Sequence, residues 1–143
     1  MKHHLKHQMD STGRQPSKVL LAEDDTDMRE LLAMSLRGAG YHVVEVGDGQ
    51  ELFEVIRMGA VGGERFRPDL IVSDIRMPGR SGIEVLRMLQ RSDWTMPVVL
   101  ITSFGDPRTH EEAKRLGAVS VLDKPFELQE LESVVRSILP PLA

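Results

Sequence analysis

The sequence VLLAEDD at residues 19–25 joins a short run of apolar residues directly to three carboxylates. Three further apolar runs also lead to a polar residue with reactive chemistry: LIVSD at 70–74 ends in an aspartate, VVLIT at 98–102 ends in a threonine, and VSVLDK at 119–124 ends in a lysine. Short Val, Ile and Leu runs between helical stretches are typical of strands buried on both faces of a parallel sheet. In an open α/β sheet the ligand binds where the carboxyl ends of the strands converge. These runs therefore predict a crevice with an acidic pair, a lone aspartate, a threonine and a lysine.

Helical segments alternate with the strand segments along the whole chain. Strands are expected at 19–22, 41–46, 70–74, 98–101 and 119–122, and helices at 26–37, 50–58, 82–90, 107–117 and 127–139. Strict alternation with right-handed crossovers gives an α/β fold, a doubly wound parallel sheet of five strands with five helices. The usual order for such a sheet is the flavodoxin-like 2-1-3-4-5, which puts the crevice beside strands 1 and 3.

Local signals mark the ends and faces of the helices. Ser81 followed by Glu84 is a capping-box pattern, and Asp106 with Pro107 is expected to cap and open the fourth helix. The first helix is amphipathic. Its buried face is expected to carry Met28, Leu31, Leu32, Ser35 and Ala39.

Two stretches lack this periodicity. Residues 1–17 are rich in His, Lys, Gln and Ser and are expected to be a disordered tail, whose histidines have no common geometry for a metal. The connection 59–67 is longer than usual, so we expect a mobile loop. The predicted organisation is one domain over 18–139 and a C-terminal tail at 140–143, which leaves no room for an output domain after it.

Composition narrows the function classes. The absence of cysteine excludes a disulfide framework, a thiolate metal site and a cysteine nucleophile, and no apolar stretch reaches membrane length. The expected location is therefore cytoplasmic. The net charge of the chain is −4. Residues 1–17 have a local charge of +2, so the rest of the chain has a charge of −6. An acidic body argues against direct binding of nucleic acid.

The residues of the predicted crevice suggest phosphoryl chemistry. If Asp24, Asp25 and Asp74 meet there, each pair at 4 Å repels by about 4 kcal/mol at an effective dielectric near 20. Such crowding requires a cation, and carboxylate oxygens suit Mg²⁺. Lys124 adds a mobile positive charge and Thr102 a hydroxyl donor. A carboxylate beside these groups is equipped to attack phosphorus and to hold the product as an acyl phosphate.

Four short motifs together resemble the receiver domain of two-component response regulators. They are EDD at 23–25, DIRMPG at 74–79, TS at 102–103 and KPF at 124–126, and the resemblance spans 18–139. It implies that Asp74 accepts a phosphoryl group from a sensor histidine kinase or a histidine phosphotransfer protein. It also implies that Asp24, Asp25 and Asp74 hold Mg²⁺ with the backbone carbonyl of Arg76.

The resemblance carries further expectations about the switch. Thr102 is expected to be the switch hydroxyl, Lys124 to bind the phosphoryl group, and the Lys124-Pro125 bond to be cis. The face made by the fourth helix, fifth strand and fifth helix would pass the signal to a downstream protein or to an output domain missing from this chain. Such a protein accepts phosphate on its own aspartate and is not a turnover enzyme, and no membrane partner is expected.

The chain departs from the family pattern near the crevice. Val121 stands where the family usually has Tyr or Phe, so the aromatic half of the switch is missing. Ser103, after the switch threonine, has the expected small size. Arg76 and Phe104 are bulky and are expected to slow water attack on the acyl phosphate.

Three other function classes fit the residues less well. Asp25-Thr26-Asp27 mimics the Asp-x-Asp nucleophile of haloacid-dehalogenase phosphatases, but the segment after Lys124 has only one acid where that group needs two. A flavodoxin would need a Ser/Thr/Gly-rich phosphate loop after the first strand. A degenerate receiver that only docks proteins would not need the intact Asp, Thr and Lys set.

Overall fold

A five-stranded parallel sheet forms the centre of the computed structural model, which describes residues 15–92, 95–103 and 107–141. The strand order is β2-β1-β5-β6-β7, and every pair is parallel. The strands are β1 (Lys18–Ala22), β2 (His42–Val46), β5 (Leu70–Asp74), β6 (Val98–Thr102) and β7 (Ser120–Asp123). Without the small hairpin described below, this is the predicted order 2-1-3-4-5.

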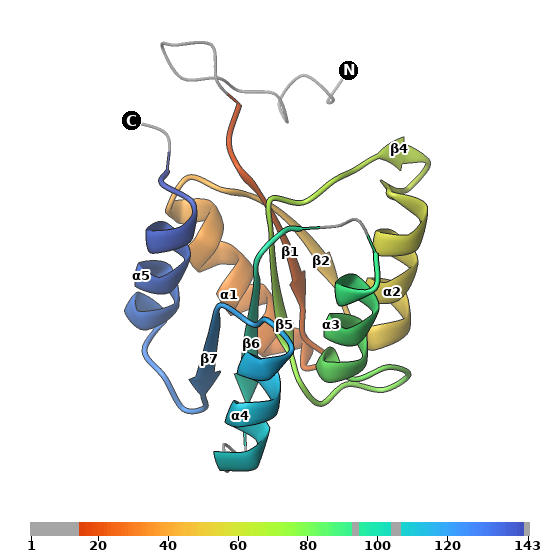
Figure 1. The fold of residues 1–143 in the computed structure, drawn as a ribbon. Coiled ribbons are helices and arrows are strands. Elements are labelled where there is room, and N and C mark those ends of the chain that lie inside the picture. The colour runs from red at the N-terminus through yellow and green to blue at the C-terminus, as the bar shows by residue number, and fades with distance from the viewer. Residues whose placement is uncertain (1–14, 93–94, 104–106, 142–143) are drawn as a thin grey trace.

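Helices cover both faces of the sheet (Figure 1). They are α1 (Thr26–Gly38), α2 (Gly49–Met58), α3 (Gly82–Gln90), α4 (Pro107–Arg115) and α5 (Leu128–Ile138). α1 and α5 pack on one face and α2, α3 and α4 on the other, so the molecule has two apolar cores. Leu20 points into one core and Leu21 into the other, which explains why consecutive residues in the middle of β1 are apolar. Among the described residues, the helices lack the length and apolar character needed to cross a bilayer.

Side-chain caps begin three of the helices. Asp25 Oδ1 accepts from Met28 N at 2.8 Å at the start of α1, and Asp48 caps α2 in the same way. The predicted capping box of α3 is confirmed, since Glu84 N donates to Ser81 Oγ and Ser81 N donates to Glu84 Oε1. The expected cap Asp106 lies outside the described residues.

The buried face of α1 differs from the prediction. The structure buries Leu32, Ala33 and Leu36, while Leu31 is 46% exposed. The prediction is confirmed for Leu32 and was wrong for Leu31, because α1 packs against both the sheet and its neighbour α5, so Ala33 and Leu36 face the core instead. Leu31 instead points outward near the carboxyl end of the sheet, where it lines a shallow surface pocket with Phe126.

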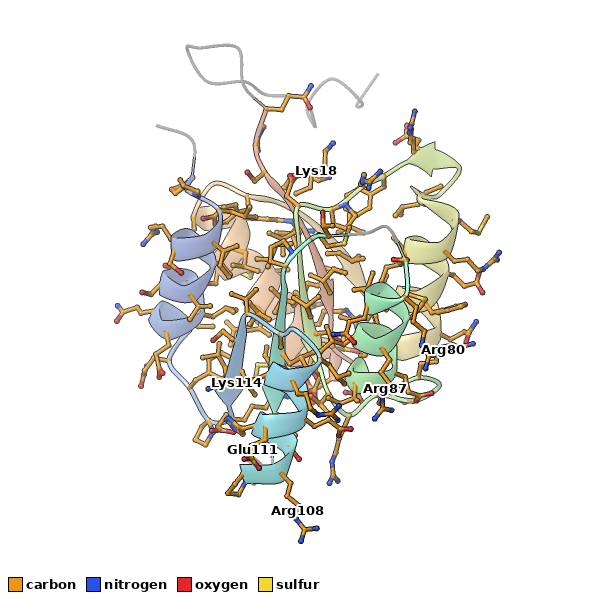
Figure 2. All side chains as sticks on the ribbon, in the orientation of Figure 1. Lys18, Arg80, Arg87, Arg108, Glu111 and Lys114 are labelled. Carbon is orange, nitrogen blue, oxygen red and sulfur yellow. The ribbon has the colours of Figure 1, made fainter. Side chains whose placement is uncertain are left out.

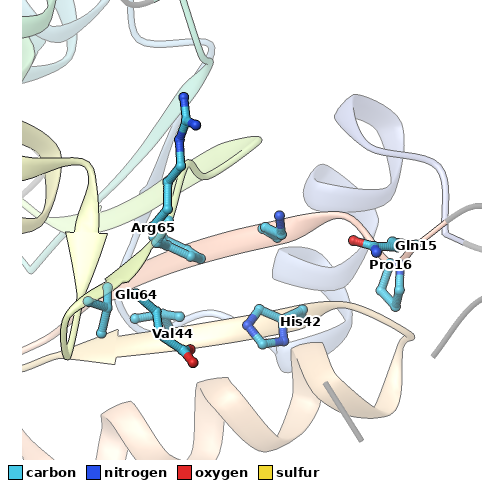
Figure 3. Close-up of a pocket in the computed structure, with 9 residues that line it drawn as sticks. Gln15, Pro16, His42, Val44, Glu64 and Arg65 are labelled. Carbon is cyan, nitrogen blue, oxygen red and sulfur yellow. The ribbon is translucent and has the colours of Figure 1, made fainter. Parts of the chain in front are cut away.

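The connection 59–67 contains a hairpin instead of an irregular mobile loop. β3 (Ala60–Val61) pairs antiparallel with β4 (Glu64–Arg65), and Gly62 and Gly63 turn the chain with positive φ. Adjacent glycines suit such a two-residue turn. The hairpin and the first residues of β1 and β2 enclose a cavity of about 130 Å³ (Figure 3). Because its lining includes Lys18 and His42, this cavity lies at the amino ends of the strands.

Candidate functional site

Polar side chains gather at the carboxyl ends of β1, β5, β6 and β7. Glu23, Asp74 and Thr102 are almost completely buried there, with 1%, 3% and 2% of their surfaces exposed. Lys124 Nζ donates to Asp74 Oδ2 at 2.9 Å and to Glu23 Oε1 at 3.0 Å. These side chains lie close together because the parallel strands end at the same edge of the sheet. The pairing places Ser73 beside Ala22 and Thr102 beside Asp123.

Three carboxylates form a group that is suited to a cation. One oxygen each from Glu23, Asp24 and Asp74 lies within 4.8 Å of the others. Glu23 and Asp74 are buried, whereas Asp24 is exposed and opens the group to solvent. Lys124 offers one positive charge to this set, so negative charge remains to be balanced. Hard carboxylate oxygens with partial access to water fit Mg²⁺.

Burial and hydrogen bonding shift two pKa values in this group. Burial raises the pKa of Glu23, and the neighbouring Asp74 adds to the rise against the opposing hydrogen bond from Lys124. For Lys124, burial alone would lower the pKa, but the hydrogen bonds to Asp74 and Glu23 raise it above its ordinary value. Lys124 therefore stays protonated at neutral pH and keeps its charge beside Asp74.

The structure does not bring Asp25 into this acidic group, so the carboxylates that lie together differ from those in the predicted metal set of Asp24, Asp25, Asp74 and the Arg76 carbonyl. Asp25 turns its side chain to the first turn of α1, where it accepts from Met28 N. Its backbone N donates to Glu23 Oε2 at 3.2 Å. Glu23 takes the place that the sequence interpretation gave to Asp25. The signal was available, because an aspartate directly before a helix is a preferred N-cap.

Arg76 lies on the loop between β5 and α3. Its backbone N donates to Asp74 Oδ1 at 3.0 Å, whereas Lys124 Nζ donates to the other oxygen, Oδ2, so both oxygens of the Asp74 carboxylate are held. Asp24, Arg76, Met77 and Ser81 line an open crevice beside the acidic group.

The remaining predicted residues lie around the same site. Lys124 N donates to Thr102 O at 2.7 Å, and the Lys124-Pro125 bond is cis, as the resemblance implied. Val121 is partly buried and packs against the core below α2, α3 and α4. Phe104, the second expected gating residue, lies outside the described residues.

Arg29 is a contact that the sequence interpretation missed. Its Nη1 donates to Glu23 O at 2.9 Å, and its Nε lies 3.6 Å from Glu45 Oε1. It therefore holds the backbone of the β1–α1 junction from α1. No sequence motif marks Arg29, apart from its place one turn into the first helix.

The alternative phosphatase interpretation needs Asp25 as a nucleophile. In the structure Asp25 is the N-cap of α1, and Thr26 and Asp27 are exposed in the first turn of that helix. The aspartate that receives Lys124 is Asp74, at the end of β5. The arrangement therefore does not support a nucleophile at Asp25.

Comparison with known proteins gives a family. A family model described as the response regulator receiver domain matches residues 19–136. Sporulation initiation phosphotransferase F of Bacillus subtilis is 29% identical over 123 residues, which cover 86% of this chain and 94% of that protein. Transcriptional regulatory protein PdtaR of Mycobacterium tuberculosis is 37% identical, and the match covers 85% of this chain but only 56% of that protein.

A solved structure agrees with this assignment. Chemotaxis protein CheY4 of Vibrio cholerae superposes with a TM-score of 0.75 at 28% identity, over 87% of this chain and 99% of that one. The family match covers the five strands of the main sheet, apart from Lys18 at the start of β1, and the segments that carry Glu23, Asp74, Thr102 and Lys124. The chain belongs to the family of receiver domains of two-component response regulators.

Proposed function

We propose that Asp74 is the phosphoacceptor of this receiver domain and that a sensor histidine kinase or a histidine phosphotransfer protein is the donor. The observation that carries the proposal is the pair of contacts from Lys124 Nζ to Asp74 and Glu23. They bring a protonated lysine to a buried carboxylate at the end of a central strand, next to two further carboxylates. This is an arrangement for phosphoryl transfer, in which positioning and charge neutralisation supply most of the catalysis.

The proposed phosphoryl transfer from a phosphohistidine to Asp74 needs no further reactant. A carboxylate oxygen of Asp74 attacks phosphorus, the new O–P bond forms, and the N–P bond to the donor imidazole breaks, so the electron pair leaves with the imidazole nitrogen. Lys124 exchanges its contact with the free carboxylate for one with a phosphoryl oxygen. The Thr102 hydroxyl donates a hydrogen bond to another phosphoryl oxygen. Acceptance of phosphate in this way makes the chain a relay component and not a turnover enzyme.

Mg²⁺ is the cofactor that this donor set fits. We propose that Glu23, Asp24 and Asp74 hold it together with the backbone carbonyl of Arg76, and that Asp25 contributes only as the cap of α1. When bound, Mg²⁺ would neutralise charge on the phosphoryl oxygens. We also predict that the protein is cytoplasmic.

The proposed output is a change in the surface formed by α4, β7 and α5, read by a downstream protein or by an output domain. Because Val121 replaces the aromatic residue, Thr102 would be the trigger, worth one charge-assisted hydrogen bond of about 1.5–3 kcal/mol. The variant Thr102→Ala should still accept phosphate but lose most of the phosphorylation-dependent change in amide exchange over residues 107–122. A response equal to that of the wild type would remove Thr102 from the switch.

Labelling with acetyl phosphate and Mg²⁺, followed by intact mass measurement, tests the phosphoacceptor. The wild type should gain one phosphoryl group and Asp74→Asn none. The matched control is Asp27→Asn, the same change at an exposed position in the first turn of α1, which should label like the wild type. Labelling of Asp74→Asn at the wild-type level contradicts the assignment.

A further inference from the structure

The loop after the phosphoacceptor, residues 75–81, is pressed against the first turn of α2. Gly49 N donates to Pro78 O at 3.0 Å, and this carbonyl also accepts from Arg80 N at 3.2 Å. Gly49 is buried at this contact. The two segments are far apart in the sequence, so the contact joins the β2–α2 junction to the phosphorylation site.

The approach is close enough to require glycine. A methyl group added at Gly49 would lie 1.7 Å from Arg80 O and 2.5 Å from Arg80 C. Nonbonded heavy atoms settle at roughly 3.5–4.0 Å, so the Arg80 backbone would have to move by more than about 1 Å. On the facing side Gly79 has a φ of +86°, and a methyl group there would lie 3.2 Å from Gln50 N and Gln50 Cβ. Both surfaces of the contact are therefore backbone.

Side chains reinforce the contact from the solvent side. The Arg80 guanidinium lies 3.8 Å from the centre of the Phe53 ring, and its Nε donates to Gln50 Oε1 at 3.4 Å. A guanidinium over an aromatic face contributes about 0.5–1 kcal/mol at exposed sites. Figure 2 shows the Arg80 side chain beside α2.

The two ends of the loop are also held. Arg76 N donates to Asp74 Oδ1 at 3.0 Å, and Gly82 N donates to Ile75 O at 2.9 Å. Because Arg76 is held to Asp74 of β5, Gly82 to Ile75 at the start of the loop, and the middle of the loop to α2, the loop has little freedom to absorb a displacement. A shift at Pro78 or Arg80 is therefore passed to Arg76.

We propose that Gly49 is a positioning residue for the phosphorylation site, because its lack of a side chain sets the depth at which the loop presents the Arg76 carbonyl to Mg²⁺. The inference rests on the proposed function, since it uses the proposed metal ligand. Mg²⁺ needs near-octahedral geometry with ligand distances of about 2.0–2.1 Å, so it tolerates displaced ligands poorly. Arg80, Gln50 and Phe53 hold the loop at that depth.

The test is a calorimetric Mg²⁺ titration of Gly49→Ala, with Gly38→Ala as the matched control. Gly38 lies at the end of α1, is exposed, and has no atom within 4 Å of an added methyl group. Gly49→Ala should raise the Mg²⁺ dissociation constant at least about fivefold because of the strict geometry of this ion. Gly38→Ala should leave it unchanged. In metal-free protein, amide exchange in residues 75–82 should be faster in Gly49→Ala.

A positioning role also predicts how labelling depends on metal. The rate of labelling by acetyl phosphate should fall in Gly49→Ala at low Mg²⁺ and recover largely at saturating Mg²⁺. A lower melting temperature with an unchanged Mg²⁺ dissociation constant would show that Gly49 is only structural and would overturn the proposal. If the wild type itself does not bind Mg²⁺, the proposed function fails together with this inference. If the wild type binds and Gly49→Ala binds equally well, only this inference fails.

If Gly49→Ala does not fold, the Mg²⁺ affinity of Arg80→Ala tests the proposal instead. It adds no atom and removes the contacts with Phe53 and Gln50. Its Mg²⁺ dissociation constant should rise about twofold or more, in keeping with the loss of a weak surface contact. The control is Arg87→Ala on α3, whose guanidinium pairs with Glu112 of α4 instead. Equal Mg²⁺ affinities of the two arginine variants and the wild type would overturn the proposal.

Discussion

Two strand-to-helix junctions build the acidic site, and they use their acidic residues in opposite ways. Between β1 and α1 the chain has only residues 23–25, and Asp25 is used as the helix cap, which leaves Glu23 and Asp24 for the crevice. Between β5 and α3 the loop is longer, and Ser81 caps the helix, so Asp74 is left free to meet Lys124. The comparison shows that the position of the cap decides which carboxylates remain available for chemistry.

Lys124 contacts both junctions, so its removal should have the largest effect. Lys124→Met keeps most of the side-chain stem but loses the charge. The initial rate of labelling by acetyl phosphate should fall roughly ten- to hundredfold, because a charge-assisted hydrogen bond of about 1.5–3 kcal/mol is lost. A time course of intact mass at saturating Mg²⁺ measures it. The control is Lys114→Met on α4, which is exposed (Figure 2), and a Lys124→Met rate within twofold of the wild type would break the comparison.

Replacing acids of the β1–α1 junction by their amides should distinguish the acid that binds the metal from the acid that caps α1. Glu23→Gln removes a buried carboxylate from the group and should weaken Mg²⁺ binding about tenfold, since Mg²⁺ favours charged oxygen ligands. Asp25→Asn should change Mg²⁺ affinity less than twofold, because Asn caps a helix about as well as Asp. Calorimetric titration of both variants measures this difference. The reverse order of effects would restore Asp25 to the metal site.

The caps themselves should have the smallest effects, and these should be similar at the two junctions. Asp25→Ala and Ser81→Ala each remove an N-cap, which costs about 1 kcal/mol of stability. Urea unfolding of the metal-free protein measures both. Ser133→Ala, at an exposed position inside α5, is the control and should stay within about 0.5 kcal/mol of the wild type. A cost near zero for Asp25→Ala would contradict its role as a cap.

The strands could be predicted because both faces of the sheet are buried, whereas their order followed from the usual topology of such sheets and not from the residue pattern. In β5 the residues 70–72 are apolar without interruption, and the polar Ser73 and Asp74 follow at the carboxyl end. The same logic placed Thr102 and Lys124 correctly, since parallel strands end at one edge. The capping box at Ser81 could be read from its spacing alone.

The errors came from features that local pattern does not decide. Leu31 and Ala33 are both apolar, and only the packing of α1 against α5 determines which of them is buried. The three consecutive acids at 23–25 allow two registers, and the choice depends on where the helix begins. The contact of Gly49 with Arg80 joins distant segments, so no sequence window contains it.

The central claim is that Asp74 carries the phosphoryl group while the acids of the first junction serve the metal and the helix. Borohydride reduction of the phosphorylated wild-type chain converts the acyl phosphate to an alcohol, and peptide mass spectrometry then locates the modified residue. The account predicts that Asp74 is reduced and that Glu23, Asp24 and Asp25 are unmodified. Reduction at Asp24 or Asp25 with Asp74 intact would contradict it.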